Sequence, residues 1–169
     1  MIHRSHHSST SARFPGASAL AATLVALLAA PVVAAPSPEE RAAYAVDSRQ
    51  SVLHLMGYYI GPLAGMARGQ LPVDLSVIAN NAGRIATLAP MIPETFSVDT
   101  RSFELETEAL DVIWEQSAEF KAKAATLQEK AEALSAMATA GSEDGIRPAI
   151  GAMGQACGSC HDEFRVDDE

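Results

Sequence analysis

The sequence is poor in cysteine, in aromatic residues and in positive charge. Its 169 residues include only two cysteines, and aromatic side chains make up 5% of the chain. A low aromatic content together with abundant alanine favours packed helices over β-sheets. Lysine and arginine number 12 against 21 acidic residues, which gives a formal charge of −9, and no basic run occurs. Binding to nucleic acid therefore has no electrostatic basis.

Both cysteines belong to one motif, Cys157-Gly158-Ser159-Cys160-His161. In an exported protein this C-x-x-C-H pattern is typical of covalent attachment of a c-type haem. On a helix Cys157 and Cys160 share a face, so both sulfurs can reach the vinyl groups of one porphyrin. His161 can then bind the iron as its proximal ligand. The motif predicts one haem c, held by two thioethers, with His161 as the metal ligand.

Two other interpretations of this motif, a disulfide and a zinc site, have less support. A disulfide between the cysteines would leave the adjacent His161 without a role. A zinc site would need four ligands, and the only other histidine outside the N-terminal segment is His54. If both thiols hold haem, a disulfide framework is excluded.

Residues 1–35 have the features of an export signal. Arg4 and Arg13 give a positive start without acidic residues, an apolar run follows over residues 19–30, and small residues end at Ala35. The run is shorter than the ~20 residues that span a bilayer, so we expect cleavage after Ala35 and no stable membrane anchor. Because haem c is attached outside the bacterial inner membrane, the expected location is the periplasm. One domain, residues 36–169, remains.

Four amphipathic helical patterns follow. The first begins at a capping box, Ser37 to Glu40, with Pro38 at the first helical position, and Gly61-Pro62 is expected to end it. The second covers 72–89, the third covers 106–140 with Gly141 as its stop, and the fourth follows a turn at 142–145 and carries the motif. Four helices with fairly short connections predict an all-α fold, an antiparallel up-down-up-down four-helix bundle with covalently bound haem.

The inward faces are read from steps of three and four residues. In the third pattern, large and small residues alternate along positions 110, 113, 117, 120, 124, 127, 131, 134 and 138, as interdigitating helices require. Trp114 is expected to be core. Arg49 is a charge within the apolar stripe of the first helix, and it either reaches out to water or lies near a buried anion such as a haem propionate. Gly151, Gly154 and Gly158 are expected where a neighbouring helix or the porphyrin edge comes close.

The chain resembles the cytochromes c′, the high-spin branch of the class II cytochromes c, over nearly all of residues 37–169. The resemblance is most specific at the stretch from Cys157 to Arg165, and it extends to residues 49–53 and 113–121. It implies that Cys157 and Cys160 form the thioethers and that His161 is the proximal ligand. It also implies that Arg49 neighbours a propionate, that Leu53 covers the distal side, and that Arg165 lies near His161.

The function expected from this resemblance depends on Leu53. Leucine offers no lone pair and no hydrogen-bond donor, so the iron would be five-coordinate and would favour NO and CO over dioxygen. A second hypothesis is a low-spin electron carrier with Met56 as sixth ligand, although Met56 is about 60° from Leu53 around the helix. His54 is turned about 100° away and is expected at the surface. An enzyme acting on peroxide or NO is least supported, because Leu53 supplies no acid-base group.

Apolar residues also occur away from the inward face of the first helix, at Leu55, Tyr58 and Tyr59. Such surface is often a subunit contact, and cytochromes c′ are commonly dimers, so a homodimer is expected. The redox partner is not identified by the sequence; the acidic charge is compatible with a basic one.

Overall fold

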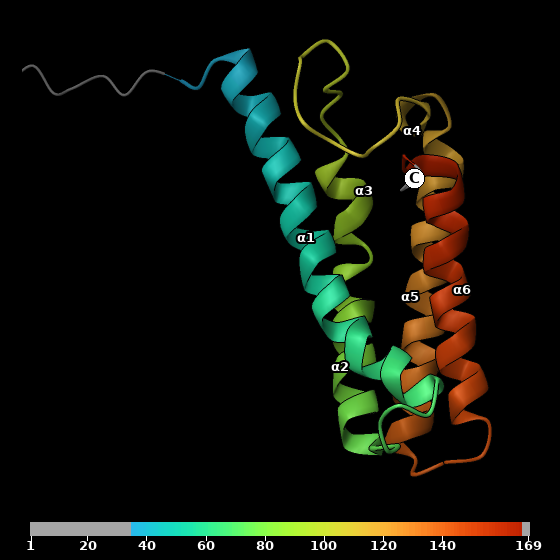
Figure 1. Ribbon diagram of the computed structural model, residues 1–169. Helices are drawn as coiled ribbons and strands as arrows, with labels where there is room; N and C mark the ends of the chain where they lie inside the picture. Colours follow the sequence, from blue (N-terminus) through green and yellow to red (C-terminus); the bar gives the residue numbers. More distant parts are fainter. Residues whose placement is uncertain (1–34, 167–169) are drawn as a thin grey trace, which may run out of the picture. The chain divides into compact units, whose positions relative to one another are not determined.

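The computed structural model describes residues 35–166, so the expected signal peptide lies outside the described residues except for Ala35. Four long helices form the bundle: α1 (Pro38–Ala67), α2 (Leu75–Leu88), α5 (Ser117–Thr139) and α6 (Ile146–Phe164). Two short helices, α3 (Met91–Thr95) and α4 (Val112–Glu115), lie in the connection between α2 and α5. The long helices run alternately up and down (Figure 1), which confirms the predicted bundle.

The helices pack in a ring in which α2 contacts α5, α5 contacts α6, and α1 contacts both α2 and α6. The predicted stripe of the third pattern is buried at seven of its nine positions: Ile113, Phe120, Ala124, Leu127, Ala131, Leu134 and Ala138. Alternation of large and small side chains lets neighbouring helices interdigitate at close range. Within residues 35–166, none of the helices has the length and apolar character needed to cross a membrane.

Helix α1 does not end at Gly61-Pro62 as predicted, because it continues through Pro62 to Ala67. A proline inside a helix removes one backbone hydrogen bond and costs ~3 kcal/mol. Two side chains beyond it, Leu63 and Met66, are 0% and 5% exposed, and each contributes about 1.5–3 kcal/mol when fully buried. The burial therefore outweighs the proline. The helix ends at Ala67 with Arg68 as its C-cap, and Gly69, with a positive φ of 73°, starts the turn.

Helix α2 begins three residues later than the predicted start at residue 72. The helix begins at Leu75, and the carboxylate of Asp74 accepts hydrogen bonds from the backbone N–H groups of Ser76 (2.9 Å) and Val77 (3.1 Å). The carboxylate also accepts a hydrogen bond from the hydroxyl of Ser76 (2.6 Å). Together these hydrogen bonds hold the pKa of Asp74 below its ordinary value, and the bond from the Ser76 hydroxyl is the largest cause. Asp74 is therefore the N-cap, and Pro72 lies outside the helix.

The predicted long helix over 106–140 is divided. Residues 106–111 are not helical, α4 is a single turn, and the chain bends at Gln116 before α5. The reason is tertiary, because the N–H of Leu110 donates to the carbonyl of Phe164 (3.0 Å) and that of Val166 to the carbonyl of Glu108 (2.8 Å). Backbone bonds to the end of α6 replace those that a helix would have made over residues 108–110. Ser117, which was expected to be inward, is exposed at the first position of α5.

Two local predictions are confirmed. Ser37 and Glu40 form the capping box of α1. Gly141 ends α5 with a φ of 76°, and the N–H of Ser142 donates back to the carbonyl of Met137 (3.2 Å), as in a Schellman turn. Pro148 is the third residue of α6, where its missing N–H has no helical partner to lose.

Candidate functional site

Cys157 and Cys160 lie on the last two turns of α6, on the face that packs against the apolar core. Both thiols are half-buried, and no disulfide joins them. Burial raises the pKa of Cys157, and it also raises that of Cys160, where the positive charge of Lys123 acts in the opposite direction. The spacing of three residues predicted from the motif therefore does place both sulfurs on one face of a helix, in a largely apolar environment.

His161 follows on the exposed side of the same turn. Its backbone carbonyl accepts a hydrogen bond from the N–H of Arg165 (3.0 Å), which is the C-cap of α6. Arg165 also donates from Nε to a carboxylate oxygen of Glu108 (2.8 Å). Arg165 thus lies just past the end of α6, four residues after His161, and its position on the proximal side of a haem stays a prediction.

The neighbouring helix α1 presents Leu53. This residue lies on the same helical face as Val46, Arg49, Met56 and Ile60, of which the first three are 7%, 2% and 8% exposed. Leu53 itself is 41% exposed. A large apolar side chain that lies on this helical face yet is uncovered is available to contact a further apolar group. His54, on the adjacent face, is exposed as predicted.

Arg49 does not extend into water, so that interpretation is wrong. Its guanidinium donates from Nε to the carbonyl of Thr95 (3.0 Å), from Nη1 to the hydroxyl of Thr100 (2.8 Å), and from Nη2 to the carbonyl of Val98. It also lies over the rings of Phe96 (4.5 Å to the centroid) and Trp114 (5.2 Å). Desolvation lowers the pKa of Arg49, with the charge of Asp99 opposing it. Protein groups therefore hold this buried cation.

Trp114 is a packing residue, as expected. It is half-buried against the core, and its indole N–H donates to the carbonyl of Phe96 (3.1 Å). From Phe96, edge-to-face ring contacts continue to Phe120 (4.9 Å) and from there to Phe164 on α6 (5.2 Å). These ring contacts thus connect the segment that surrounds the guanidinium of Arg49 to α6, the helix that carries the cysteines.

The structure adds residues that the sequence did not indicate. Residues 95–111, which we call the strap, contact α1 through Arg49 and contact the end of α6 through residues 108–110. On the other side of α6, Lys123 of α5 forms an ion pair with Glu163 (2.7 Å). Partners 40 or more positions apart in sequence leave no periodic signal, so only the fold brings them together.

The three glycines of α6 do not sit against another helix. A Cβ built on Gly151, Gly154 or Gly158 would have no neighbouring atom within 4 Å. The explanation by close helix packing is therefore wrong, and the approach of a porphyrin edge stays a prediction.

These residues fit a covalently attached porphyrin. Two half-buried thiols share one face, an imidazole follows directly, and the helix packed beside them carries an uncovered leucine. A metal site of protein ligands alone is not supported, because no group of three or more His, Cys, Asp or Glu residues that could hold a metal ion occurs in the described part of the chain.

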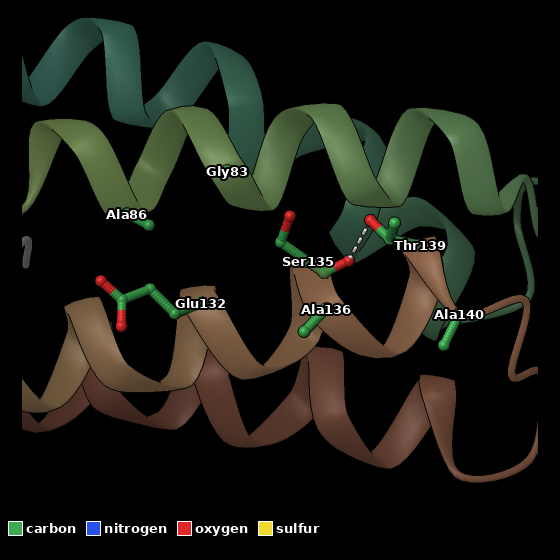
Figure 2. Close-up of a pocket in the computed structure, with 7 residues that line it drawn as sticks. All are labelled: Gly83, Ala86, Glu132, Ser135, Ala136, Thr139 and Ala140. Carbon is green, nitrogen blue, oxygen red and sulfur yellow. Dashed lines mark hydrogen bonds between the residues drawn. The ribbon is translucent and has the colours of Figure 1, made fainter.

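A groove lies elsewhere, between α2 and α5 (Figure 2). Its lining is mostly of small residues: Gly83, Ala86, Glu132, Ser135, Ala136, Thr139 and Ala140. The hydroxyl of Ser135 donates to the carbonyl of Ala79 (2.9 Å), and that of Thr139 to the carbonyl of Ser135 (2.8 Å). Its hydroxyl groups are thus satisfied by helix carbonyls, and neither cysteine lies in its lining.

The fold and the site define a c-type haem protein built on a four-helix bundle. A sequence model of the cytochrome c′ family matches residues 44–165. The cytochrome c′ of Cereibacter sphaeroides is 34% identical over 149 residues, which is 87% of this chain and 96% of that protein. The chain belongs to the cytochrome c′ family, and its haem c is attached through Cys157 and Cys160.

Solved structures agree. The cytochrome c prime of Shewanella frigidimarina superposes with a TM-score of 0.68 at 31% identity, covering 75% of this chain and 97% of that one. The nitric oxide complex of a leucine-to-alanine variant of cytochrome c prime from Alcaligenes xylosoxidans gives a TM-score of 0.66 at 33% identity, with the same coverage.

Proposed function

We propose that this protein binds nitric oxide and carbon monoxide at a five-coordinate haem iron and can exchange electrons. His161 would hold the iron from the proximal side and Leu53 would cover the distal side. Arg49 and Arg165 would lie at the haem edge and on the proximal side. When bound, the haem supplies the iron that takes up the gas, while the chain supplies the proximal ligand and an apolar cover.

The exposed position of Leu53 carries this proposal. Its neighbours on the inward face of α1 are buried, whereas Leu53 is 41% exposed. A hydrocarbon side chain can limit the room above the iron, but it cannot ligate it or donate a hydrogen bond to bound dioxygen. Ligands that need no polar stabilisation are therefore favoured. The nitric oxide complexes of leucine-to-alanine and leucine-to-isoleucine variants of cytochrome c prime from Alcaligenes xylosoxidans support this choice of ligand.

Six-coordinate iron with Met56 as the sixth ligand is the competing proposal. Met56 is 8% exposed and belongs to the apolar core cluster of the bundle. Ligation would require its thioether to leave that packing. The burial of Met56 therefore favours the five-coordinate proposal.

Absorption spectra of the purified holoprotein and its variants test the two proposals. We expect high-spin bands in the wild type and in Met56→Leu, because the thioether is not a ligand. Leu53→Ala should raise CO affinity by about tenfold or more, equivalent to ~1.4 kcal/mol, because it enlarges the distal space. Low-spin bands in the wild type that turn high-spin in Met56→Leu would overturn the five-coordinate assignment.

We propose no enzymatic role, because an apolar distal residue gives peroxide cleavage no acid-base group. Peroxide turnover far above that of free haem would contradict this. The net charge of −9 favours a basic redox partner at low ionic strength.

We also propose export to the periplasm with cleavage after Ala35. The first helix is capped at Ser37, two residues later, so cleavage would leave the bundle intact. The N-terminal sequence of protein from the periplasmic fraction tests this, and a retained leader would contradict it.

A homodimer through α1 is the last part of the proposal. Tyr44 and Tyr58 are each 74% exposed and Leu55 is 47% exposed, and their spacing places them on one helical face. Tyr59, which we expected on this surface, is instead half-buried and packs against the core. Sedimentation at low concentration should give a dimer that Leu55→Lys converts to monomer, whereas monomeric wild type would refute it.

A further inference from the structure

The strap, residues 95–111, bridges the two helices that carry the proposed distal and proximal residues. Figure 1 shows this segment in yellow, running from α3 to α4 beside the C-terminal end of α6. Each end of the strap is fixed by hydrogen bonds to a different helix. Its course therefore links α1 to α6 at the same end of the bundle.

The contact with α1 is centred on Arg49. Three donors of its guanidinium reach residues 95, 98 and 100 of the strap. The side-chain amide of Gln50 adds a longer bond to the carbonyl of Glu106 (3.4 Å). Since Thr100 is only 5% exposed, its bond to Arg49 is shielded from water.

The contact with α6 is made mostly by backbone. An isolated antiparallel bridge joins Ala109 to Arg165, and the bonds from Leu110 to Phe164 and from Val166 to Glu108 flank it. The ion pair of Glu108 with Arg165 (2.8 Å) reinforces it. Backbone bonds of this kind fix register as well as distance.

Each of these two contacts lies four residues along the chain from a residue of the proposed haem site. Arg49 lies four residues before Leu53 on α1, and Arg165, the C-cap of α6, lies four residues after His161. Four residues are about one helical turn, or ~6 Å along the axis. A displacement of either helix at the strap is thus transmitted to the residue one turn away.

From this geometry we propose that Thr100 and Glu108 are positioning residues, which set the separation of α1 and α6 and so the room that Leu53 leaves above the iron. This inference rests on the five-coordinate function proposed above. Under this proposal Thr100 and Glu108 influence ligand affinity through the positions of α1 and α6, without touching the ligand.

The test uses CO titration of the ferrous holoprotein. Thr100→Val removes the acceptor of the Arg49 bond, and Glu108→Ala removes the ion pair with Arg165. Matched controls are Thr126→Val, at an exposed threonine of α5 whose hydroxyl bonds only its own helix, and Glu104→Ala, at an exposed strap residue that forms neither contact. We expect each strap variant to raise CO affinity by about threefold or more, with both controls unchanged.

Introducing the same substitutions into Leu53→Ala distinguishes an effect exerted through Leu53 from a general destabilisation of the fold. If the strap acts through Leu53, the strap variants should have no further effect once that side chain is removed. An equal effect in both backgrounds would overturn the proposal.

Hydrogen exchange of the holoprotein supplies a readout that does not depend on ligand binding. Amides of Leu110, Val166 and residues 50–56 should exchange faster in the strap variants. Faster exchange with unchanged CO affinity would overturn the positioning role, and so would unchanged exchange. If the wild-type iron is six-coordinate, the proposed function fails. Faster exchange of residues 50–56 in the strap variants would still support the link from the strap to α1. Unchanged exchange of these residues would refute that link.

Discussion

The buried guanidinium of Arg49 allows a quantitative test of how α1 is held. Arg49→Met keeps a long apolar stem of similar length but removes all the donors. The substitution breaks the bonds to Thr95 and Val98 and the bond to the hydroxyl of Thr100 (2.8 Å). Because the bonds link residues about 50 positions apart, their loss should weaken the tertiary fold more than α1 itself.

The expected loss of stability depends on whether each group that contacts Arg49 can find another hydrogen-bond partner in the Arg49→Met variant. The buried Thr100 hydroxyl loses its donor, which costs about 1–3 kcal/mol. The carbonyls of Thr95 and Val98 belong to half-buried and exposed residues, so water can replace the guanidinium there. The ring contacts at 4.5 and 5.2 Å add about 0.5–1 kcal/mol each. Relief of the desolvated charge offsets part of this, and we expect a net loss of about 2–4 kcal/mol.

Urea unfolding of the holoprotein, followed by far-UV circular dichroism, measures this difference by linear extrapolation. Arg84→Met, at an exposed arginine of α2, is the control and should change stability by less than about 0.5 kcal/mol. Arg49→Lys should also be destabilised, since one ammonium group cannot replace a planar guanidinium that bonds three separate acceptors. An Arg49→Met variant within about 0.5 kcal/mol of the wild type would refute the reasoning.

Three further predictions concern other parts of the chain. Cys160→Ser should leave a haem held by a single thioether, seen as a shifted pyridine haemochrome band; an unshifted band would contradict attachment at that thiol. Ala82→Leu, at a fully buried alanine of α2, should cost about 1–3 kcal/mol of stability through overpacking, whereas Ala125→Leu on the exposed face of α5 should be near neutral. Because hydrogen bonds hold the pKa of Asp74 below its ordinary 3.8, its contribution is present above that pH and lost as the pH falls through the lower folded value. Asp74→Asn should remove this part of the acid sensitivity, measured by unfolding between about pH 5 and pH 2; identical pH profiles would contradict the cap.

Local patterns along the chain were enough to predict the cytochrome family, the helical bundle and the attachment site of the haem. Helical periodicity is a local property, because residues three and four apart share a face whatever packs against them. The C-x-x-C-H motif is equally local, so Cys157, Cys160 and His161 could be assigned without coordinates. The caps at Ser37 and Gly141 were readable for the same reason.

Local rules fail where contacts between distant segments are stronger, and those contacts could be seen only in the folded protein. Burial of Leu63 and Met66 carries α1 through Pro62, and backbone bonds from residues 108–110 to the end of α6 interrupt the expected third helix. The partners of Arg49 lie about 50 positions away in a segment without periodicity, so the sequence could mark it as an anomaly but could not name what holds it. Contacts between distant segments depend on how elements pack, and a pattern read along one element does not contain that information.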